Sequence, residues 1–401
     1  MTEHDAHTSW SPLVLAGYAG ALAAPEVVWS LLDAGCRVVC FSNRDIDSVL
    51  GYEPNVVIEP VPDVAEGVER VVSALDELIE KHRPDVLLPM DDLSLFLLGR
   101  THKALHLLPN AAEGTSAVPL DKRLQLDLAQ KAGFQVPEFA FVGCRDDVSG
   151  WSVFPAVLKP ALVAREINGK IGRSSVRHVE TREDLDRQLE TADFTEPWIL
   201  QQYVKGVGEG LFGHMMSDHI ANVSGHRRVR MMNPAGSGSS VCVSIQQDEG
   251  VVTAATKMLR EINWRGMFMI ELLRAEDGTL WFMELNGRAW GSMALARRQG
   301  FEYPAWTVKQ HLDPEFVPLE VQVKSGLICR HLGRDIVHLL FVLRGRRGAP
   351  KDIWPGRIST MFRVLVPNFS YTYYNKRKGR FRMFFADTIR TVRAQLRKRS
   401  A

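Results

Sequence analysis

The sequence has few of the features that mark secreted or membrane-spanning proteins. Its five cysteines are scattered over 401 residues, without a CxxC pair and without histidines at zinc-ligand spacing, which argues against a disulfide framework or a zinc module. The N-terminal residues lack the basic and apolar segments of a secretion signal. The apolar run 336–343 is too short to cross a bilayer. We therefore expect a cytoplasmic protein with reduced thiols.

The chain as a whole also lacks an excess of one charge. Lysine and arginine number 49 against 47 acids, a net charge of +2, which argues against a nucleic-acid-binding protein. The tail is different, because Asp387 is the only acid from Tyr371 onward among many lysines and arginines. Apolar residues recur there on one predicted helix face, namely Phe381, Phe384, Phe385, Ile389, Val392 and Leu396. The sequence leaves three partners open for this helix: its own domain, a second subunit of a homodimer, or an anionic membrane in peripheral contact.

The hydrophobic pattern predicts a parallel α/β unit followed by an α+β region. A length of 401 residues suggests two or three domains. Apolar strand patterns alternate with amphipathic helices up to about residue 90, an order typical of a parallel sheet. Later strand patterns are separated by glycine-rich or charged turns and lie at 154–159, 198–204, 267–273 and 279–286. A turn at 274–278 favours an antiparallel hairpin of the last two strands.

Polar residues interrupt both strands of this expected hairpin. Glu284 and Asn286 share one face because side chains alternate along a strand, and Glu271 lies in the partner strand. Buried carboxylates require cations or strong donors nearby. Two carboxylates and an amide oxygen suit Mg²⁺ together with phosphate oxygens. The alternative, which the sequence leaves open, is structural pairing of the carboxylates with an arginine: Arg265, Arg274 or Arg288.

Two segments upstream offer groups that suit phosphate. Lys159 ends an apolar strand pattern just before Pro160, which leaves its ammonium at a strand end as a point charge. The segment 169–176 contains glycines together with Ser174 and Ser175. It suits a flap whose backbone N–H groups cover phosphates, and a solvated hairpin turn is the alternative.

A further strand pattern offers contacts for a nucleoside. Its end contributes side chains and free backbone groups that could meet an adenine edge, from Gln201, Gln202, Tyr203 and Val204. Glu209 follows a glycine turn and suits ribose hydroxyls. An edge strand with an exposed acid is the alternative. Asp91 and Asp92 follow an earlier parallel strand, where crevice residues lie, unless they only cap a helix.

The order of these parts resembles the ATP-grasp superfamily of carboxylate-activating ligases. The resemblance runs from about Leu13 to His311, and its most specific element is Glu284-Leu-Asn286-Gly-Arg288 with Glu271 before it. Further stretches are similar to the branch described as carboxylate-amine ligase or carbamoyl-phosphate-synthase-like, at 226–228, 236–240, 264–267 and 286–296. The resemblance implies a Rossmann-like domain over 1–115 and two ATP-grasp subdomains over 116–197 and 198–320. It leaves a helical, basic C-terminal extension over 321–401.

The resemblance also implies a site for ATP and Mg²⁺. Glu271, Glu284 and Asn286 would hold two magnesium ions, with Mn²⁺ as a substitute, between the nucleotide phosphates. Lys122 and Lys159 would bind phosphates, and the catalytic residues would be Lys159, Arg228 and Arg288. The γ-phosphate of ATP would pass to a small-molecule carboxylate. An amine would then attack the acyl phosphate, which gives an amide, ADP and phosphate.

Several alternatives stay open at this point. Bicarbonate could be the activated acid, as in carboxyphosphate or carbamoyl-phosphate chemistry, or the chain could be a non-catalytic ATP-binding regulatory module. Arg288 contacts the reacting groups or only neutralises the two glutamates. A basic cluster consists of Arg227, Arg228 and Arg230. Together with the loop 236–240, this cluster either holds the substrate carboxylate or forms a solvated turn. The acid and amine substrates cannot be read from the sequence.

Overall fold

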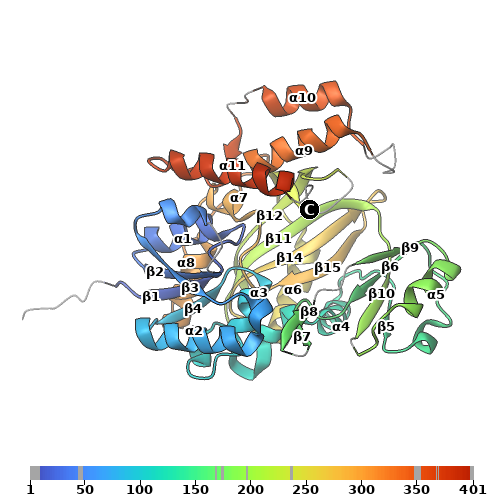
Figure 1. The fold of residues 1–401 in the computed structure, drawn as a ribbon, viewed down its shortest axis with the longest axis horizontal. Helices are drawn as coiled ribbons and strands as arrows, with labels where there is room; N and C mark the ends of the chain where they lie inside the picture. The colour runs from blue at the N-terminus through green and yellow to red at the C-terminus, as the bar shows by residue number, and fades with distance from the viewer. Residues whose placement is uncertain are drawn as a thin grey trace, which may run out of the picture.

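A parallel sheet forms the N-terminal part of the protein (Figure 1). The computed structural model describes residues 10–43, 48–167, 169–172, 176–195, 197–234, 238–346, 354–366, 368 and 370–397. The sheet has the order β3-β2-β1-β4 and contains β1 (Leu13–Gly17), β2 (Arg37–Asn43), β3 (Val56–Val61) and β4 (Val86–Pro89). All of its pairings are parallel, so the predicted α/β unit is confirmed.

Helices cover both faces of this sheet because side chains alternate along each strand. Val14 and Ala16 of β1 join the hydrophobic cluster of α1 (Ala24–Asp33). Leu13 and Leu15 join the cluster of α2 (Val68–His82) instead. The next helix, α3 (Asp92–Leu98), follows β4 directly, and the Asp91 side chain accepts a hydrogen bond from the Ser94 N–H at its N-terminus.

A second, antiparallel sheet follows with the order β5-β10-β6-β9. It consists of β5 (Phe139–Val142), β6 (Ala156–Pro160), β9 (Arg177–Val179) and β10 (Trp198–Gln202). Leu185 and Leu189 of α5 (Arg182–Glu190) pack on its apolar residues. A short hairpin of β7 (Arg165–Ile167) and β8 (Lys170–Gly172) precedes β9. Of this hairpin, β8 lies within the segment 169–176 that was predicted as a flap, whereas β7 precedes it.

The largest sheet has seven strands in the order β15-β14-β11-β12-β13-β16-β17. These are β11 (Gly206–Met215), β12 (Ile220–Met231), β13 (Ser239–Ser244), β14 (Gly266–Ala275), β15 (Leu280–Asn286), β16 (Ile328–Arg330) and β17 (Thr372–Tyr373). α4 (Lys122–Ala132) and α6 (Glu249–Glu261) share a hydrophobic cluster with β11, β14 and β15. Gly133, with φ of 99°, ends α4. The predicted hairpin of β14 and β15 is confirmed as antiparallel.

The C-terminal segment adds three helices and two strands to this body. The helices are α9 (Leu332–Arg344), α10 (Arg357–Leu365) and α11 (Phe381–Arg397). They lie together beside one end of the seven-stranded sheet (Figure 1), and α9 contacts both of the others. β16 and β17 extend the sheet itself. Within the described residues, no helix combines the length and the apolarity that a membrane crossing requires.

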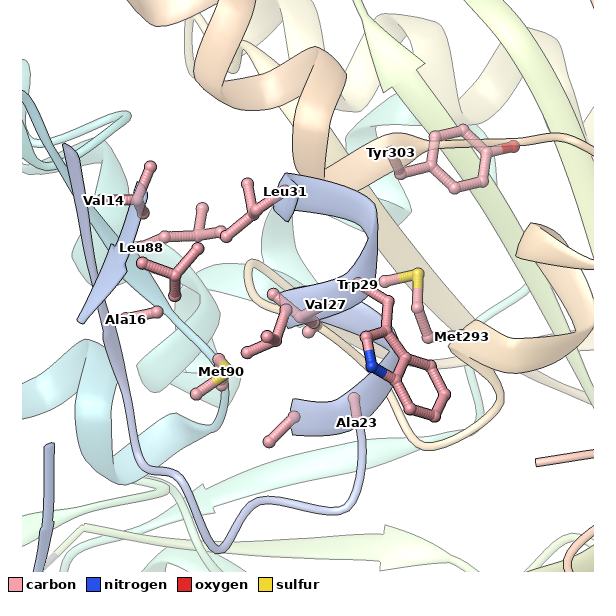
Figure 2. Packing of buried hydrophobic residues seen from close by; sticks show 14 of the residues in the cluster. Val14, Ala16, Ala23, Val27, Trp29, Leu31, Leu88, Met90, Met293 and Tyr303 are labelled. Atoms are coloured by element: carbon pink, nitrogen blue, oxygen red, sulfur yellow. The ribbon is translucent and has the colours of Figure 1, made fainter. Parts of the chain in front are cut away.

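A shared core joins the N-terminal sheet to the rest of the molecule. Figure 2 shows α1 with Val27 and Leu31 toward the strands, while Trp29 lies near Met293. Met293 belongs to α7 (Met293–Arg297), and the neighbouring α8 (Tyr303–Leu312) contributes to the same cluster. The buried Glu26 carboxylate of α1 accepts hydrogen bonds from Arg297 and Arg298 and from the Asn375 N–H. The N-terminal sheet, the large sheet and the C-terminal segment therefore form one packed body.

Candidate active site

The β14–β15 hairpin brings the predicted metal ligands together. Glu271 lies directly opposite Glu284, and Asn286 lies opposite Met269. A register shift follows Glu271 in this pairing. The Asn286 amide nitrogen is 3.5 Å from Glu284 Oε1. Within the described residues, no group of three or more His, Cys, Asp or Glu side chains forms a metal cluster, so the candidate set is two carboxylates completed by an amide.

Basic side chains from three other elements surround these carboxylates. Arg228 of β12 forms an ion pair with Glu271. Lys159, at the end of β6, donates to Gln201 Oε1 over 2.6 Å. Lys122, the first residue of α4, interacts electrostatically with Lys159 and with Glu284. Because these residues come from separate strands and a helix, only the folded chain assembles the cluster.

Burial and neighbouring charges separate the pKa values of the two glutamates. Burial raises the pKa of Glu271 to about 7, against the effect of the Arg228 charge, and the adjacent Glu284 raises it further. Burial also disfavours ionisation of Glu284, but Lys122 and Arg288 outweigh it and hold the pKa of Glu284 below its ordinary value. The pair therefore carries an ionised Glu284 beside a Glu271 that titrates near neutral pH.

Lys159 is a partly buried cation of the site. Burial lowers its pKa to about 8, and the charge of Lys122 lowers it further, while the two glutamates raise it. Its hydrogen bond to the neutral Gln201 amide leaves the ammonium without a carboxylate hydrogen-bond partner among the described contacts. An anionic ligand at this position would compensate the charge.

The arginines named in the structural alternative do not pair with the two site glutamates. Arg274 pairs with Glu209, and the Arg265 N–H donates to the Asn110 side chain. Arg288 forms two hydrogen bonds to Asp92 of α3, at 2.9 and 2.8 Å. Arg288 thus joins the β15 region to the N-terminal sheet, and its charge still acts on Glu284.

The other arginines of the basic cluster also have carboxylate partners. Glu209 lies inside β11, is fully buried, and pairs with Arg227 at 2.7 Å and with Arg274 at 3.0 Å. Arg230 pairs with the fully buried Asp335 at 2.6 Å. The alternative of an exposed acid at Glu209 is therefore wrong, whereas its contact with ribose stays a prediction.

The predicted nucleoside segment lies at the junction of β10 and β11. The Gln202 and Tyr203 N–H groups donate to the Glu138 and Pro155 carbonyls, which leaves the Val204 N–H as the candidate donor to adenine. The Gln202 side chain accepts from the Glu138 N–H at 3.3 Å. The predicted phosphate contacts of Ser174 and Ser175 lie outside the described residues. These nucleotide contacts stay predictions.

A cavity of about 140 Å³ opens beside the three predicted metal ligands. Glu271, Glu284 and Asn286 form part of its wall. Two further wall residues, Arg334 and Tyr374, come from the C-terminal segment, which the sequence interpretation left outside the site. Gly238 and Ser239 also line it and belong to the predicted loop 236–240, of which 236 and 237 are outside the described residues.

Arg334 differs from the other arginines of this cavity. Its guanidinium donates to the Ser239 carbonyl over 3.1 Å, and no described carboxylate forms an ion pair with it. Burial lowers the pKa of Arg334 from its ordinary value. His226 lies in the same wall, and its Nε2 is buried without a hydrogen-bond partner in the described structure. Burial lowers the His226 pKa to about 3, so the ring is neutral. The same cavity wall thus contains the two glutamates, an arginine without a described ion-pair partner and an unsatisfied imidazole nitrogen.

A larger cavity of about 850 Å³ lies elsewhere, between residues 105–115 and 307–315. Its walls are mostly apolar and contain none of the predicted site residues. Size alone therefore does not identify the site, whereas the convergence of charged groups does.

Solved structures resemble this chain over most of its length. An L-amino acid ligase from Bacillus licheniformis gives a TM-score of 0.59 at 19% identity, covering 77% of this chain and 75% of that one. An N5-carboxyaminoimidazole synthetase from Staphylococcus aureus, complexed with ADP, gives 0.58 at 13% identity, covering 79% and 81%. A biotin carboxylase from Campylobacter jejuni gives 0.60 at 15% identity, covering 79% and 74%. The chain has the ATP-grasp fold.

Sequence comparison of this ATP-grasp chain gives a weaker signal. No family model matches the sequence. The vancomycin B-type resistance protein VanB of Enterococcus faecalis is 26% identical over 190 residues, which cover 43% of this chain and 53% of that protein. The chain thus spans about half the length of this curated relative. The fold predicted from the sequence motifs is confirmed, and the reaction is a separate question.

Proposed function

We propose that this ATP-grasp protein is an ATP-dependent ligase that joins a small-molecule carboxylate to an amine. The reaction would form an amide through an acyl phosphate and release ADP and phosphate. The observation that carries the proposal is the cluster of Glu271, Glu284 and Asn286 beside Lys159. The L-amino acid ligase among the similar structures supports an acid–amine reaction.

The donor set fits divalent cations. Two adjacent carboxylates and an amide oxygen are hard ligands suited to Mg²⁺, and Mn²⁺ could replace it. Burial raises the pKa of Glu271 although the Arg228 charge opposes the shift, so a bound cation would favour the ionised carboxylate. When bound, ATP supplies the phosphoryl group that activates the carboxylate, and magnesium neutralises its phosphate oxygens. We assign two ions to Glu271, Glu284 and Asn286.

The surrounding cations would orient the nucleotide and the acid. Lys159 and Lys122 lie where phosphates can balance their mutual repulsion. Arg288 forms an ion pair with Asp92, and Arg228 forms an ion pair with Glu271. These ion pairs fix the positions of both guanidinium groups at the site. Positioning of this kind supplies most of the catalysis in phosphoryl transfer.

We propose that Arg334 binds the anionic group of the acid substrate. Arg227 and Arg230, candidates from the sequence, are engaged by Glu209 and Asp335. Arg334 is in contrast without a carboxylate partner in the described structure and lines the cavity beside the metal set. A guanidinium can hold a carboxylate through two parallel hydrogen bonds. The acid would then lie between Arg334 and the metal ions.

The test measures ADP and phosphate release with panels of acids and amines. Glu284→Gln and Asn286→Ala should each lower the magnesium-dependent rate by about 10²- to 10³-fold, the range for loss of one group that stabilises developing charge. Glu276→Gln is the matched control, because Glu276 is an exposed residue in the turn of the same hairpin. Full activity of Glu284→Gln would remove the metal assignment.

The same assay separates the alternative chemistry. ADP release that depends on bicarbonate, with no other acid present, would indicate carboxyphosphate formation instead of amide ligation. ATP binding without turnover on any acid and amine would indicate a regulatory module. Mass spectrometry of the product identifies the amide directly.

A further inference from the structure

The outward face of α10 is apolar. Ile358, Met361, Phe362 and Leu365 recur at the spacing of one helix face, and Ile358 and Phe362 are 71% and 60% exposed. The buried residues of the helix are Thr360 and Val364, on the side that packs toward α9. The larger apolar side chains therefore face solvent, an arrangement that marks a contact surface.

α11 repeats this arrangement. Phe381, Phe385 and Ile389 follow one another at intervals of four residues and are 53%, 57% and 50% exposed. Phe384, which the sequence interpretation placed on the same face, is buried instead and packs against Tyr373 with ring centroids 5.8 Å apart. One side of α11 thus packs against its own domain, which is one of the three alternatives that the sequence left open. The other side is exposed.

Exposed basic residues lie on both helices and on the segment between them. The exposed basic residues of this region are Arg357, Arg363, Lys376, Lys378, Arg382, Arg393 and Arg397. From residue 354 to 397 the only acid is Asp387. Asp387 accepts a hydrogen bond from Asn375 and lies 3.4 Å from His331 Nε2, inside the domain. The surface therefore combines large apolar side chains with cations that have no acid among them.

The folded body holds these helices in place. Met383 of α11 belongs to the core cluster that contains α1. Arg380, just before α11, pairs with Glu53 of the N-terminal part at 2.8 Å. Asp335 of α9 pairs with both Arg230 and Arg330. The exposed faces thus exist before any partner arrives, which lowers the entropic cost of binding.

We propose that α10 and α11 form a docking surface for an anionic lipid bilayer. The surface consists of their exposed apolar residues and the basic residues around them. At a bilayer interface, apolar side chains enter the acyl boundary while lysines and arginines meet anionic headgroups. If the same surface of a second copy of this chain docked here, arginines would face arginines. A nucleic acid would contact the basic residues but would leave the phenylalanines exposed to water. The surface is independent of the proposed ligase reaction.

Co-sedimentation of the full chain with vesicles tests this surface. One vesicle type contains phosphatidylcholine alone, and the other contains phosphatidylcholine mixed with phosphatidylglycerol. We expect binding to the anionic vesicles that weakens as salt is added. Phe362→Ser with Phe385→Ser should abolish it. Arg363→Gln with Arg393→Gln should lower the partition coefficient by about tenfold or more, since each cation near an anionic surface contributes measurably.

The matched control variants carry the same kinds of substitution at exposed positions outside α10 and α11. Lys131→Gln with Lys257→Gln removes two exposed charges from α4 and α6, which lie away from α10 in Figure 1. Val317→Ser with Leu319→Ser removes two exposed apolar side chains. Both controls should bind vesicles as the unaltered chain does. Circular dichroism and ATP binding of each variant show whether its fold is intact.

Three results would overturn the proposal. The first is absence of sedimentation with anionic vesicles. The second is vesicle binding that neither the phenylalanine nor the arginine changes reduce. The third is a dimer in sedimentation velocity that the phenylalanine changes dissociate, without vesicle binding, which would assign the surface to a second copy of the chain. ADP release by the same protein preparations reports on the ligase reaction separately.

Discussion

Lys159 gives the sharpest quantitative prediction, because its burial opposes the stability of the nucleotide-free protein. Burial and the charge of Lys122 lower its pKa from 10.5 to about 8. A difference of this size corresponds to about 3 kcal/mol against the folded, protonated state. Lys159→Met keeps the apolar stem and removes the charge. It also removes the hydrogen bond to Gln201, which costs about 1 kcal/mol, so the net gain in unfolding free energy should be about 2 kcal/mol.

The pH dependence identifies the cause of this gain. Below about pH 8 both folded and unfolded states carry the proton, and the full penalty applies. Between about 8 and 10.5 the folded state has lost the proton while the unfolded state keeps it, so the penalty falls as pH rises. The difference in stability between Lys159→Met and the unaltered chain should therefore be largest near neutral pH and shrink toward pH 10.

Urea unfolding of the nucleotide-free proteins at several pH values measures this difference. Nucleotide binding should change in the opposite direction, because the variant lacks the charge that phosphates compensate. Titration with ATP and magnesium should show an affinity about 10²-fold lower, as for loss of a charge-assisted contact. A variant that is less stable at every pH, or one that binds ATP unchanged, would refute the assignment of Lys159 as a buried phosphate ligand.

Two further predictions concern the arginines. Arg334→Ala should raise the KM for the acid about 10²-fold with little change in the KM for ATP. Arg334→Lys should recover only part of this loss, because a lysine cannot form two parallel hydrogen bonds to a carboxylate. A KM for the acid that is the same in Arg334→Ala and in the unaltered chain would reject the subsite. Glu209→Gln should lower the unfolding free energy by about 2 to 3 kcal/mol, because Arg227 and Arg274 lose their shared buried carboxylate. Thermal unfolding measures the change, and ATP affinity of the folded variant shows whether Glu209 also contacts ribose.

The hairpin of the site was predictable because its signal is local. Apolar residues define β14 and β15, and polar side chains interrupt them at positions that alternation assigns to known faces. The turn sets the pairing as far as Leu272 opposite Phe282, and the register shift after Glu271 then places Glu271 opposite Glu284. The parallel order of the first sheet follows from the same kind of pattern. Strand periodicity and turn chemistry were sufficient for the hairpin and the parallel sheet, whereas the register shift that pairs the two glutamates has no local signal.

Contacts between distant segments were not predictable in this way. Asp92 could be placed at a strand end, but nothing near it in the sequence indicates its pairing with Arg288. The partner of Glu271 is Arg228, not one of the three arginines that are nearer in sequence. Arg334 carries no recognisable motif, and its place in the cavity depends on β16 joining the sheet beside β13. These pairings are decided by packing of whole elements, which local patterns do not encode.

The position of α9 connects the two proposals through one helix. Asp335, in its first turn, is fully buried and pairs with Arg230 of β12 and Arg330 of β16, so the start of the helix is fixed to the large sheet. Arg334, the preceding residue, therefore reaches the cavity from a rigid position. α9 also packs against α10 and α11. The proposed acid subsite at Arg334 and the proposed bilayer-docking helices therefore share α9 as their support.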